Sequence, residues 1–319
     1  TQAAPKSPTA CRETKRDVYE RATMKRIGLT VSLLIAMALS ALAQANDQHS
    51  YANTDEVVVR HLDLNLTADF QEQQLIGNVV LHIQRKRAGV KELVLDTRDL
   101  VIVSVETGDG EGWDFSGYTQ GEPHAALGRS LNIPLQENSD RVRINYATRP
   151  SATGLQWLEA RQTAGGKHPY MYSQAQAIHA RSFIPLQDTP AVRVTYQATI
   201  YTPRELRAVM SAGNNPAAPR TGIYRFDMPH PIPSYLIAMA VGDLEFKAMG
   251  ERTGVYAEAA NLDAAAAEFE DTEAMLEHVE TMYGEYRWDR YDLLILPPSF
   301  PWGGMENPRL SFITPTVIA

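Results

Sequence analysis

Apolar residues occupy every second position along much of the segment 53–247. The clearest runs are at 62–66, 79–83, 101–105, 131–135, 142–146 and 192–200. Alternation with a period of two is typical of half-buried strands, which turn one face to the core and the other to water. Turn clusters such as Gly108-Asp109-Gly110 separate the runs. The pattern therefore predicts an antiparallel β domain.

Two later segments lack this alternation. Residues 235–241 are apolar almost throughout, which predicts a strand buried on both faces. Residues 263–283 are rich in Ala, Glu, Met and Leu, which predicts one amphipathic helix. Its signals are an apolar face of Phe269, Leu276, Val279 and Tyr283, an N-cap at Asn261 or Asp263, and Gly284 as its end. Strands are predicted at 291–296 and 310–314, on either side of a Pro/Gly loop at 297–304. This succession of helix and strands predicts that an α/β domain begins after residue 252.

Composition and charge exclude several classes of protein. The chain has 319 residues, of which 44% are hydrophobic and 21% charged, as expected for a globular protein of about two domains. Its one cysteine, Cys11, rules out an internal disulfide framework. The net charge is −8. Residues 1–45 contain seven basic and three acidic residues, a charge of +4, so the remaining residues carry −12. Such an acidic body argues against nucleic acid as a partner, because binding to phosphates requires Lys and Arg.

Residues 24–45 have the pattern of a secretory signal peptide. Met24 is followed by Lys-Arg, an apolar run at 27–42 and the small-x-small sequence Ala43-Gln44-Ala45. The alternative is a membrane anchor, but the run is short for a hydrocarbon core about 30 Å thick. We expect cleavage after Ala45, a periplasmic or secreted protein, and no stable membrane anchor afterwards. Residues 1–23 then represent translated upstream sequence.

The sequence lacks several common catalytic motifs. Its eight His residues form no H-E-x-x-H pair, and G-x-S-x-G, G-x-x-x-x-G-K-[ST] and G-x-G-x-x-G are missing. One loop, W-G-G-M-E-N-P at 302–308, combines two glycines with a carboxylate. Adjacent glycines let a ligand approach the backbone closely, but such loops also occur as plain solvated turns. The residues alone leave both interpretations open.

The longer segment that contains this loop resembles a known protein family. Residues 291–316 resemble the exopeptidase loop of the aminopeptidase N and leukotriene A(4) hydrolase family of zinc peptidases. Their sequence is Y-D-L-L-I-L-P-P-S-F-P-W-G-G-M-E-N-P-R-L-S-F-I-T-P-T. The G-x-M-E-N form of the loop with two glycines is similar to that of the leukotriene hydrolase branch. The stretches 173–181, 185–190 and 231–238 are similar to the N-terminal domain of that branch. The resemblance implies a mainly β fold: a saddle-like antiparallel β domain at 46–252, then the incomplete start of a thermolysin-like α/β catalytic domain at 253–319.

The resemblance also implies roles for individual residues. Glu306 would bind the free α-ammonium group of the substrate, for which a carboxylate is suited as an ion-pairing acceptor. Gly303 and Gly304 would offer backbone N–H groups to the scissile carbonyl. The remaining implied substrate-binding residues are Gln174, Ala175 and Gln176, which form the Q-x-Q of the S1 region, Trp302, which replaces the usual Tyr with a bulkier wall, and Met305 and Asn307, which shape the loop.

The expected function is therefore that of a zinc-dependent aminopeptidase acting on peptides with a free N-terminus. In the family, H-E-x-x-H and a downstream Glu bind Zn²⁺, whereas this sequence reaches Ala319 without that motif. We expect a fragment with no catalytic residues and no metal ligands of its own, which hydrolyses nothing by itself. The alternative is a non-catalytic β-domain protein that binds peptides or proteins, as a pseudoenzyme or the product of a degraded gene.

Overall fold

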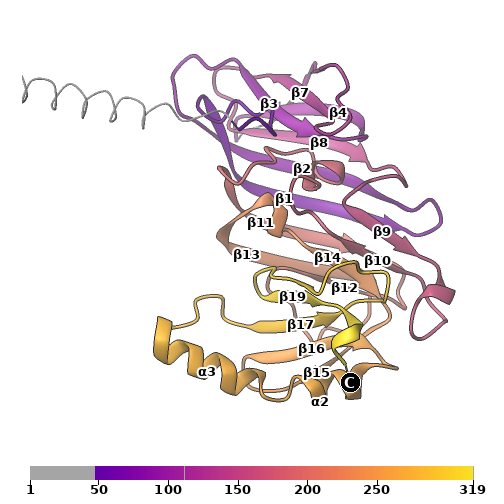
Figure 1. The fold of residues 1–319 in the computed structure, drawn as a ribbon. Helices are drawn as coiled ribbons and strands as arrows, with labels where there is room; N and C mark the ends of the chain where they lie inside the picture. The colour runs from indigo at the N-terminus through magenta and orange to yellow at the C-terminus, as the bar shows by residue number, and fades with distance from the viewer. Residues whose placement is uncertain (1–46, 111, 319) are drawn as a thin grey trace, which may run out of the picture. The chain divides into compact units, whose positions relative to one another are not determined.

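The computed structural model describes residues 47–110 and 112–318. The predicted signal peptide and the upstream segment lie outside these described residues. From Gln48 onward the chain forms one compact unit built mainly of β-strands, which confirms the predicted fold class (Figure 1). Among the helices of the described residues, none is long and apolar enough to cross a membrane.

The largest sheet has seven strands and contains most of the alternating runs. Its order is β13 (Ile223–Pro233), β11 (Arg193–Tyr201), β1 (Val57–Asp69), β2 (Gln74–Arg85), β8 (Arg141–Ala147), β4 (Val101–Gly108) and β5 (Trp113–Ser116). Five predicted runs coincide with β1, β2, β4, β8 and β11, except that Val192 lies just before β11, so these predictions are confirmed. Burial alternates along β1 as expected. Leu62, Leu64 and Leu66 are buried, whereas Asn65 and Thr67 on the other face of the strand are exposed.

One pairing in this sheet differs from the antiparallel prediction. β1 and β11 run parallel, with His61 opposite Thr195, while the other neighbouring strands of the sheet are antiparallel. Parallel neighbours need a long connection, and these two residues are 134 positions apart in the sequence. The alternation reports which face of a strand is buried and carries no information about its direction, which explains why the prediction was wrong here.

Two smaller sheets cover the inner face of the large one. They have the orders β12 (Arg207–Met210), β14 (Met239–Gly242), β10 (Tyr170–Ser173), β9 (Leu155–Leu158), and β3 (Glu92–Thr97), β7 (Arg129–Pro134), β6 (Thr119–Gln120). The predicted run at 131–135 falls largely in β7. One apolar cluster includes Leu62 and Leu81 of the large sheet together with Leu93 of β3 and Met171 of β10. The core of the β part therefore lies between these layers.

The strand predicted at 235–241 is only half correct. Its second half lies in β14, where all four residues are buried as expected. Its first half lies in a short 3₁₀ helix, Ser234–Leu236, that begins after Pro233. The hydroxyl of Ser234 donates to a carboxylate oxygen of buried Asp188 at 2.6 Å, which holds this turn in place. This tertiary contact overrides the apolar pattern.

The last sheet has five strands and mixed directions. Its order is β15 (Leu244–Ala248), β16 (Thr253–Glu258), β17 (Tyr291–Ile295), β19 (Leu310–Ile313) and β18 (Gly304–Met305). β17 is parallel to both β16 and β19, and the predicted strands at 291–296 and 310–314 are confirmed. β15 and β16 form an antiparallel pair, so the predicted domain boundary at 252 falls within one hairpin.

The single helix predicted at 263–283 is two helices, α2 (Leu262–Glu268) and α3 (Thr272–Tyr283). The chain turns between them, where the Thr272 hydroxyl donates to the carbonyl of Phe269 at 2.6 Å. Gly284 ends α3 with a positive φ of 88°, as predicted. Of the predicted apolar face, Leu276 is buried, whereas Tyr283 is 83% exposed. The apolar spacing of residues 263–283 did not reveal this break, because a turn between two helices leaves no signal in the spacing.

Candidate functional site

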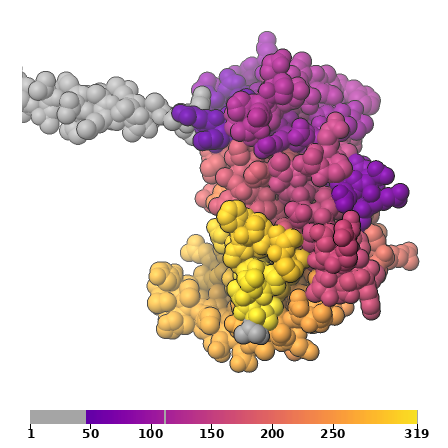
Figure 2. Space-filling model, turned by 45° about the vertical axis from the view of Figure 1, so that its right-hand side comes forward, coloured from indigo at the N-terminus to yellow at the C-terminus, as the bar shows by residue number. Residues whose placement is uncertain are grey.

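The predicted Q-x-Q segment and the predicted glycine loop meet in space. Gln174 directly follows β10, and its side-chain Nε2 donates to the Sδ of Met305 in β18 at 3.5 Å. These residues are 131 positions apart. In Figure 2 the C-terminal segment, drawn in yellow, lies against residues of the β part. The fold thus brings together two segments that the sequence singled out separately.

Aromatic packing holds the two segments in contact. Tyr172 of β10 meets the ring of Phe300 edge-on, with ring centroids 5.8 Å apart, and its hydroxyl lies 3.3 Å from the Oγ of Ser299. Met305 and Phe312 belong to the same buried apolar cluster. Burial of side chains of this size stabilises by about 1.5–3 kcal/mol each, so the loop is fixed to the β part.

The two glycines of the loop are in different environments. Gly304 lies in β18 opposite Ile313, and a β-carbon there would be 3.3 Å from the carbonyl oxygen of Phe312. Gly303 is exposed, and a β-carbon there would meet no atom within 4 Å. Neither residue has a positive φ. The fold therefore does not itself require glycine at position 303, and the space beside it is open.

Two polar residues follow Met305. Glu306 is exposed, and its carboxylate has no ion pair or hydrogen bond with the described residues. Asn307 is only 3% exposed, and its side-chain Nδ2 has no hydrogen-bond partner. A free carboxylate on a fixed loop can bind a cation from solution, and a buried amide donor without a partner is unusual in a folded protein.

A pocket of about 220 Å³ lies where these segments meet. Three of the predicted residues line it, namely Gln174, Gln176 and Trp302, and the side-chain Oε1 of Gln174 is buried without a hydrogen-bond partner. The pocket is not lined by the other predicted residues, which are Ala175, Gly303, Gly304, Met305, Glu306 and Asn307. Ala175 is buried, and its carbonyl accepts the backbone N–H of His179 at 2.8 Å.

Sequence reasoning missed His179, Thr153 and Tyr172, which also line the pocket. The ring Nδ1 of His179 lies 2.8 Å from the Oγ1 of Thr153. Burial lowers the pKa of His179 most strongly, and the positive charge of Arg98 lowers it further. His179 belongs to the stretch 173–181 that the resemblance covers, but no local pattern indicates that it faces a pocket formed with Trp302.

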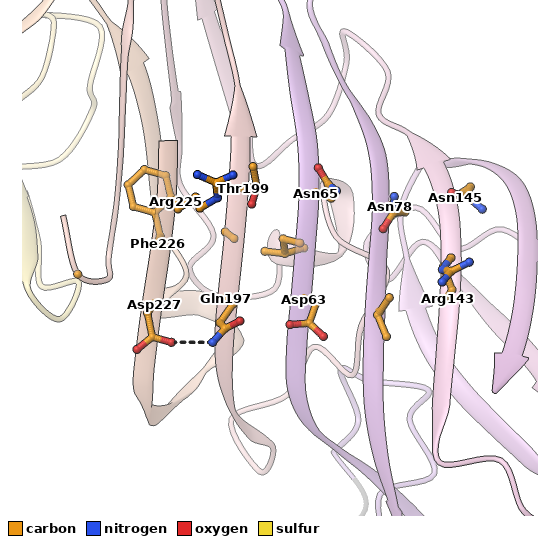
Figure 3. Close-up of a pocket in the computed structure, with 14 residues that line it drawn as sticks. Asp63, Asn65, Asn78, Arg143, Asn145, Gln197, Thr199, Arg225, Phe226 and Asp227 are labelled. Atoms are coloured by element: carbon orange, nitrogen blue, oxygen red, sulfur yellow. Dashed lines mark hydrogen bonds between the residues drawn. The ribbon is translucent and has the colours of Figure 1, made fainter. Parts of the chain in front are cut away.

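A larger groove of about 790 Å³ lies elsewhere, on the exposed face of the seven-stranded sheet (Figure 3). Three of its four charged residues have partners: Asp63 contacts His61 and His82, Arg143 pairs with Glu106 at 3.2 Å, and Asp227 accepts a hydrogen bond from Gln197 at 3.3 Å. None of the predicted site residues lines it. Paired polar side chains are ordinary for the wet face of a sheet, so the groove is not the candidate site.

No group of three or more His, Cys, Asp or Glu side chains among the described residues is arranged to hold a metal ion. The described residues therefore do not fit a catalytic zinc ion.

Comparison with known proteins identifies the family of this chain. The family model for the peptidase M1 N-terminal domain matches residues 58–236. Leukotriene A-4 hydrolase of Xenopus laevis is 42% identical over 283 residues, which cover 86% of this chain and 46% of the relative. Leucine aminopeptidase 2 of Yarrowia lipolytica is 41% identical over 277 residues, which cover 86% of this chain and 42% of the relative.

A solved structure shows the same fold. The structure of yeast LTA4 hydrolase in complex with bestatin is similar with a TM-score of 0.80 and 37% identity, covering 87% of this chain and 43% of that one. The chain spans less than half the length of these relatives. The family model nevertheless matches more than half of the chain, and its sheets are those of the solved relative. The chain therefore belongs to the peptidase M1 family, whose N-terminal domain it contains.

Proposed function

We propose that this chain is the substrate-binding part of a zinc-dependent aminopeptidase, which removes N-terminal residues from peptides. The names of the relatives support this proposal, since they include a leucine aminopeptidase and a leukotriene hydrolase. The chain covers less than half of each relative, so the activity of a complete enzyme is carried over here as a proposal.

One observation carries the proposal. Glu306 is an exposed carboxylate without a partner among the residues that the structure describes, and it directly follows Met305, which contacts Gln174 of the pocket. In this role Glu306 pairs with the α-ammonium group of the peptide through charge-assisted hydrogen bonds. Endopeptidases do not need such a group, because their substrates continue in both directions past the scissile bond. An anchored ammonium group limits cleavage to the first peptide bond.

The other residues have supporting roles. Gln174 and Gln176 orient the first residue of the peptide from the side of the β part, and Trp302 forms one wall of the pocket. The open space beside Gly303 admits the peptide backbone, whose scissile carbonyl accepts an N–H group of the glycine loop. Met305 and Asn307 are buried and keep this loop in position.

Zinc belongs to the complete enzyme in this proposal and supplies the activated water for hydrolysis. The described residues of this chain do not fit such an ion. The chain by itself binds peptides and does not hydrolyse them. We also propose that the protein is exported to the periplasm or secreted, on the basis of the sequence pattern at 24–45.

Binding of dipeptides tests the role of Glu306. We expect Glu306→Gln to weaken the binding of Leu-Gly about 10- to 100-fold, because a hydrogen-bonded charge pair is lost. Binding of N-acetyl-Leu-Gly, which has no ammonium group, should not change. Isothermal titration calorimetry measures both, and Glu277→Gln, at an exposed position of α3, is the matched control. Equal losses for the free and the acetylated peptide would refute the proposed role.

A further inference from the structure

The pocket beside Trp302 has a definite chemical character. None of the described residues that line it is an Asp, Glu, Lys or Arg. Leu155, Pro301, Tyr172 and Trp302 supply apolar surface. Gln174 adds a buried carbonyl oxygen that lacks a partner. A charged group that enters such a pocket loses water without gaining a counter-ion, which is costly.

His179 is the one residue of this lining that can become charged near neutral pH. Its backbone is fixed, because its carbonyl accepts the Ser182 hydroxyl at 2.8 Å and the Ser182 N–H at 3.0 Å. Its ring is held on one side by Thr153 through Nδ1. The other ring nitrogen, Nε2, has no hydrogen-bond partner among the described residues. It is therefore available to a ligand.

The charges around His179 favour its neutral form. Burial lowers its pKa first, and Arg98 and Arg181 lower it further, while Asp188 acts in the opposite direction. Asp188 is itself paired with Arg181 at 3.0 Å, so the opposite effects of these two charges on the imidazole largely cancel, which leaves burial and Arg98 as the main causes. At neutral pH the pocket thus presents an uncharged imidazole, which donates or accepts one hydrogen bond.

We infer that His179 is a specificity-determining residue: the pocket receives the first side chain of the peptide, and the neutral imidazole selects a large uncharged side chain with a hydrogen-bonding end, such as tyrosine. Acidic side chains are rejected until His179 gains a proton and becomes their counter-ion. This inference rests on the proposed function for the position of the peptide. A volume of about 220 Å³ is sufficient for an aromatic side chain.

The first test compares Tyr-Gly with Phe-Gly, which differ by one hydroxyl group. We expect the chain to bind Tyr-Gly about three- to tenfold more tightly, the value of one hydrogen bond. His179→Ala should abolish this preference, and His179→Gln, which can still form a hydrogen bond, should retain part of it. His278→Ala, at an exposed position of α3, is the control. A preference that persists in His179→Ala would overturn the inference.

The second test uses pH and compares Glu-Gly with Gln-Gly, so that titration of the peptide amine cancels in the ratio. We expect the affinity of Glu-Gly relative to Gln-Gly to rise as the pH falls from about 8 to about 5.5. The rise should disappear in His179→Ala and in His179→Gln, because neither side chain gains a proton. A rise of the same size in these variants would contradict a role for His179.

The inference and the proposed function can fail separately. N-acetyl-Tyr-Gly and N-acetyl-Phe-Gly lack the ammonium group but retain the side chains. If Glu306→Gln has no effect on free dipeptides while His179 still controls the Tyr to Phe ratio, the proposed role of Glu306 fails alone. If Glu306 distinguishes free from acetylated peptides while His179→Ala leaves all the ratios unchanged, the inference fails alone. Circular dichroism of each variant identifies any loss of fold.

Discussion

Two glycines of this chain are constrained in opposite ways. A β-carbon at Gly242 would lie 2.4 Å from the ring of Tyr170, whereas one at Gly303 would meet nothing within 4 Å. We therefore expect Gly242→Ala to lower the free energy of unfolding by about 1–3 kcal/mol, and Gly303→Ala to change it by less than about 0.5 kcal/mol. Urea denaturation measures both.

The same glycine substitutions separate packing from binding. Gly303→Ala should retain its stability but bind free-amine dipeptides more weakly, because its methyl group fills space that the peptide backbone needs. A Gly303→Ala variant that unfolds as readily as Gly242→Ala would show that the fold, and not a ligand, requires glycine at position 303.

Residues of the site differ in how far the sequence could predict them. The resemblance predicts that Gln174, Gln176 and Trp302 bind substrate, and the fold places these residues around one pocket. His179 was not named, because its position in the pocket depends on contacts with Thr153 and on the approach of the loop that carries Trp302. Contacts between distant segments leave no local pattern in a single sequence. The roles of all these residues remain predictions.

At the scale of the elements, one arginine links α3 to the hairpin of β15 and β16. Arg252 donates from Nη1 to Glu280 at 2.8 Å and from Nε to Glu273 at 3.1 Å. Its hydrogen bond lowers the pKa of Glu280 below the ordinary value of 4.5, and the backbone N–H of Tyr286 adds to this effect. The arrangement therefore favours the ionised carboxylate in the folded state.

This link predicts a dependence of stability on pH. Because the folded pKa of Glu280 is lowered, its contribution is present above pH 4.5 and is lost as the pH falls through the folded pKa. We expect Arg252→Met to be less stable than the wild type at pH 7, with a smaller loss of stability between about pH 5 and about pH 3. Chemical denaturation across this range measures the effect, with Lys167→Met as the control. Parallel curves for Arg252→Met and the wild type would contradict this assignment.

Errors at this scale have a common cause. The period-two runs gave correct strands in β1, β2, β4, β8 and β11, because each strand buries one face. The predictions of a strand at 235–241 and of one helix at 263–283 were partly wrong, because the chain turns at Ser234 and at Thr272, whose hydroxyls donate to Asp188 and to the carbonyl of Phe269. Apolar periodicity reports burial and does not detect such local turns.

At the scale of the whole molecule, the described residues combine three β-sheets with a five-stranded mixed sheet and the helices α2 and α3. The mainly β class and the family could be predicted, because the first depends on many repeated residues and the second on long similar runs. The parallel pairing of β1 and β11 could not, because strand direction depends on a connection of more than a hundred residues. The pocket of the candidate site could not be predicted for the same reason, since it forms where β10 and the segment after it meet the loop that precedes β18.

A crystal structure of the chain with bound Tyr-Gly would test the central claim most directly. We predict the amine of the dipeptide beside the carboxylate of Glu306 and its phenol ring in the pocket formed by Trp302, Gln174 and His179. A dipeptide bound with its amine away from Glu306, or bound in the groove of Asn65 and Arg225 on the seven-stranded sheet, would contradict the claim.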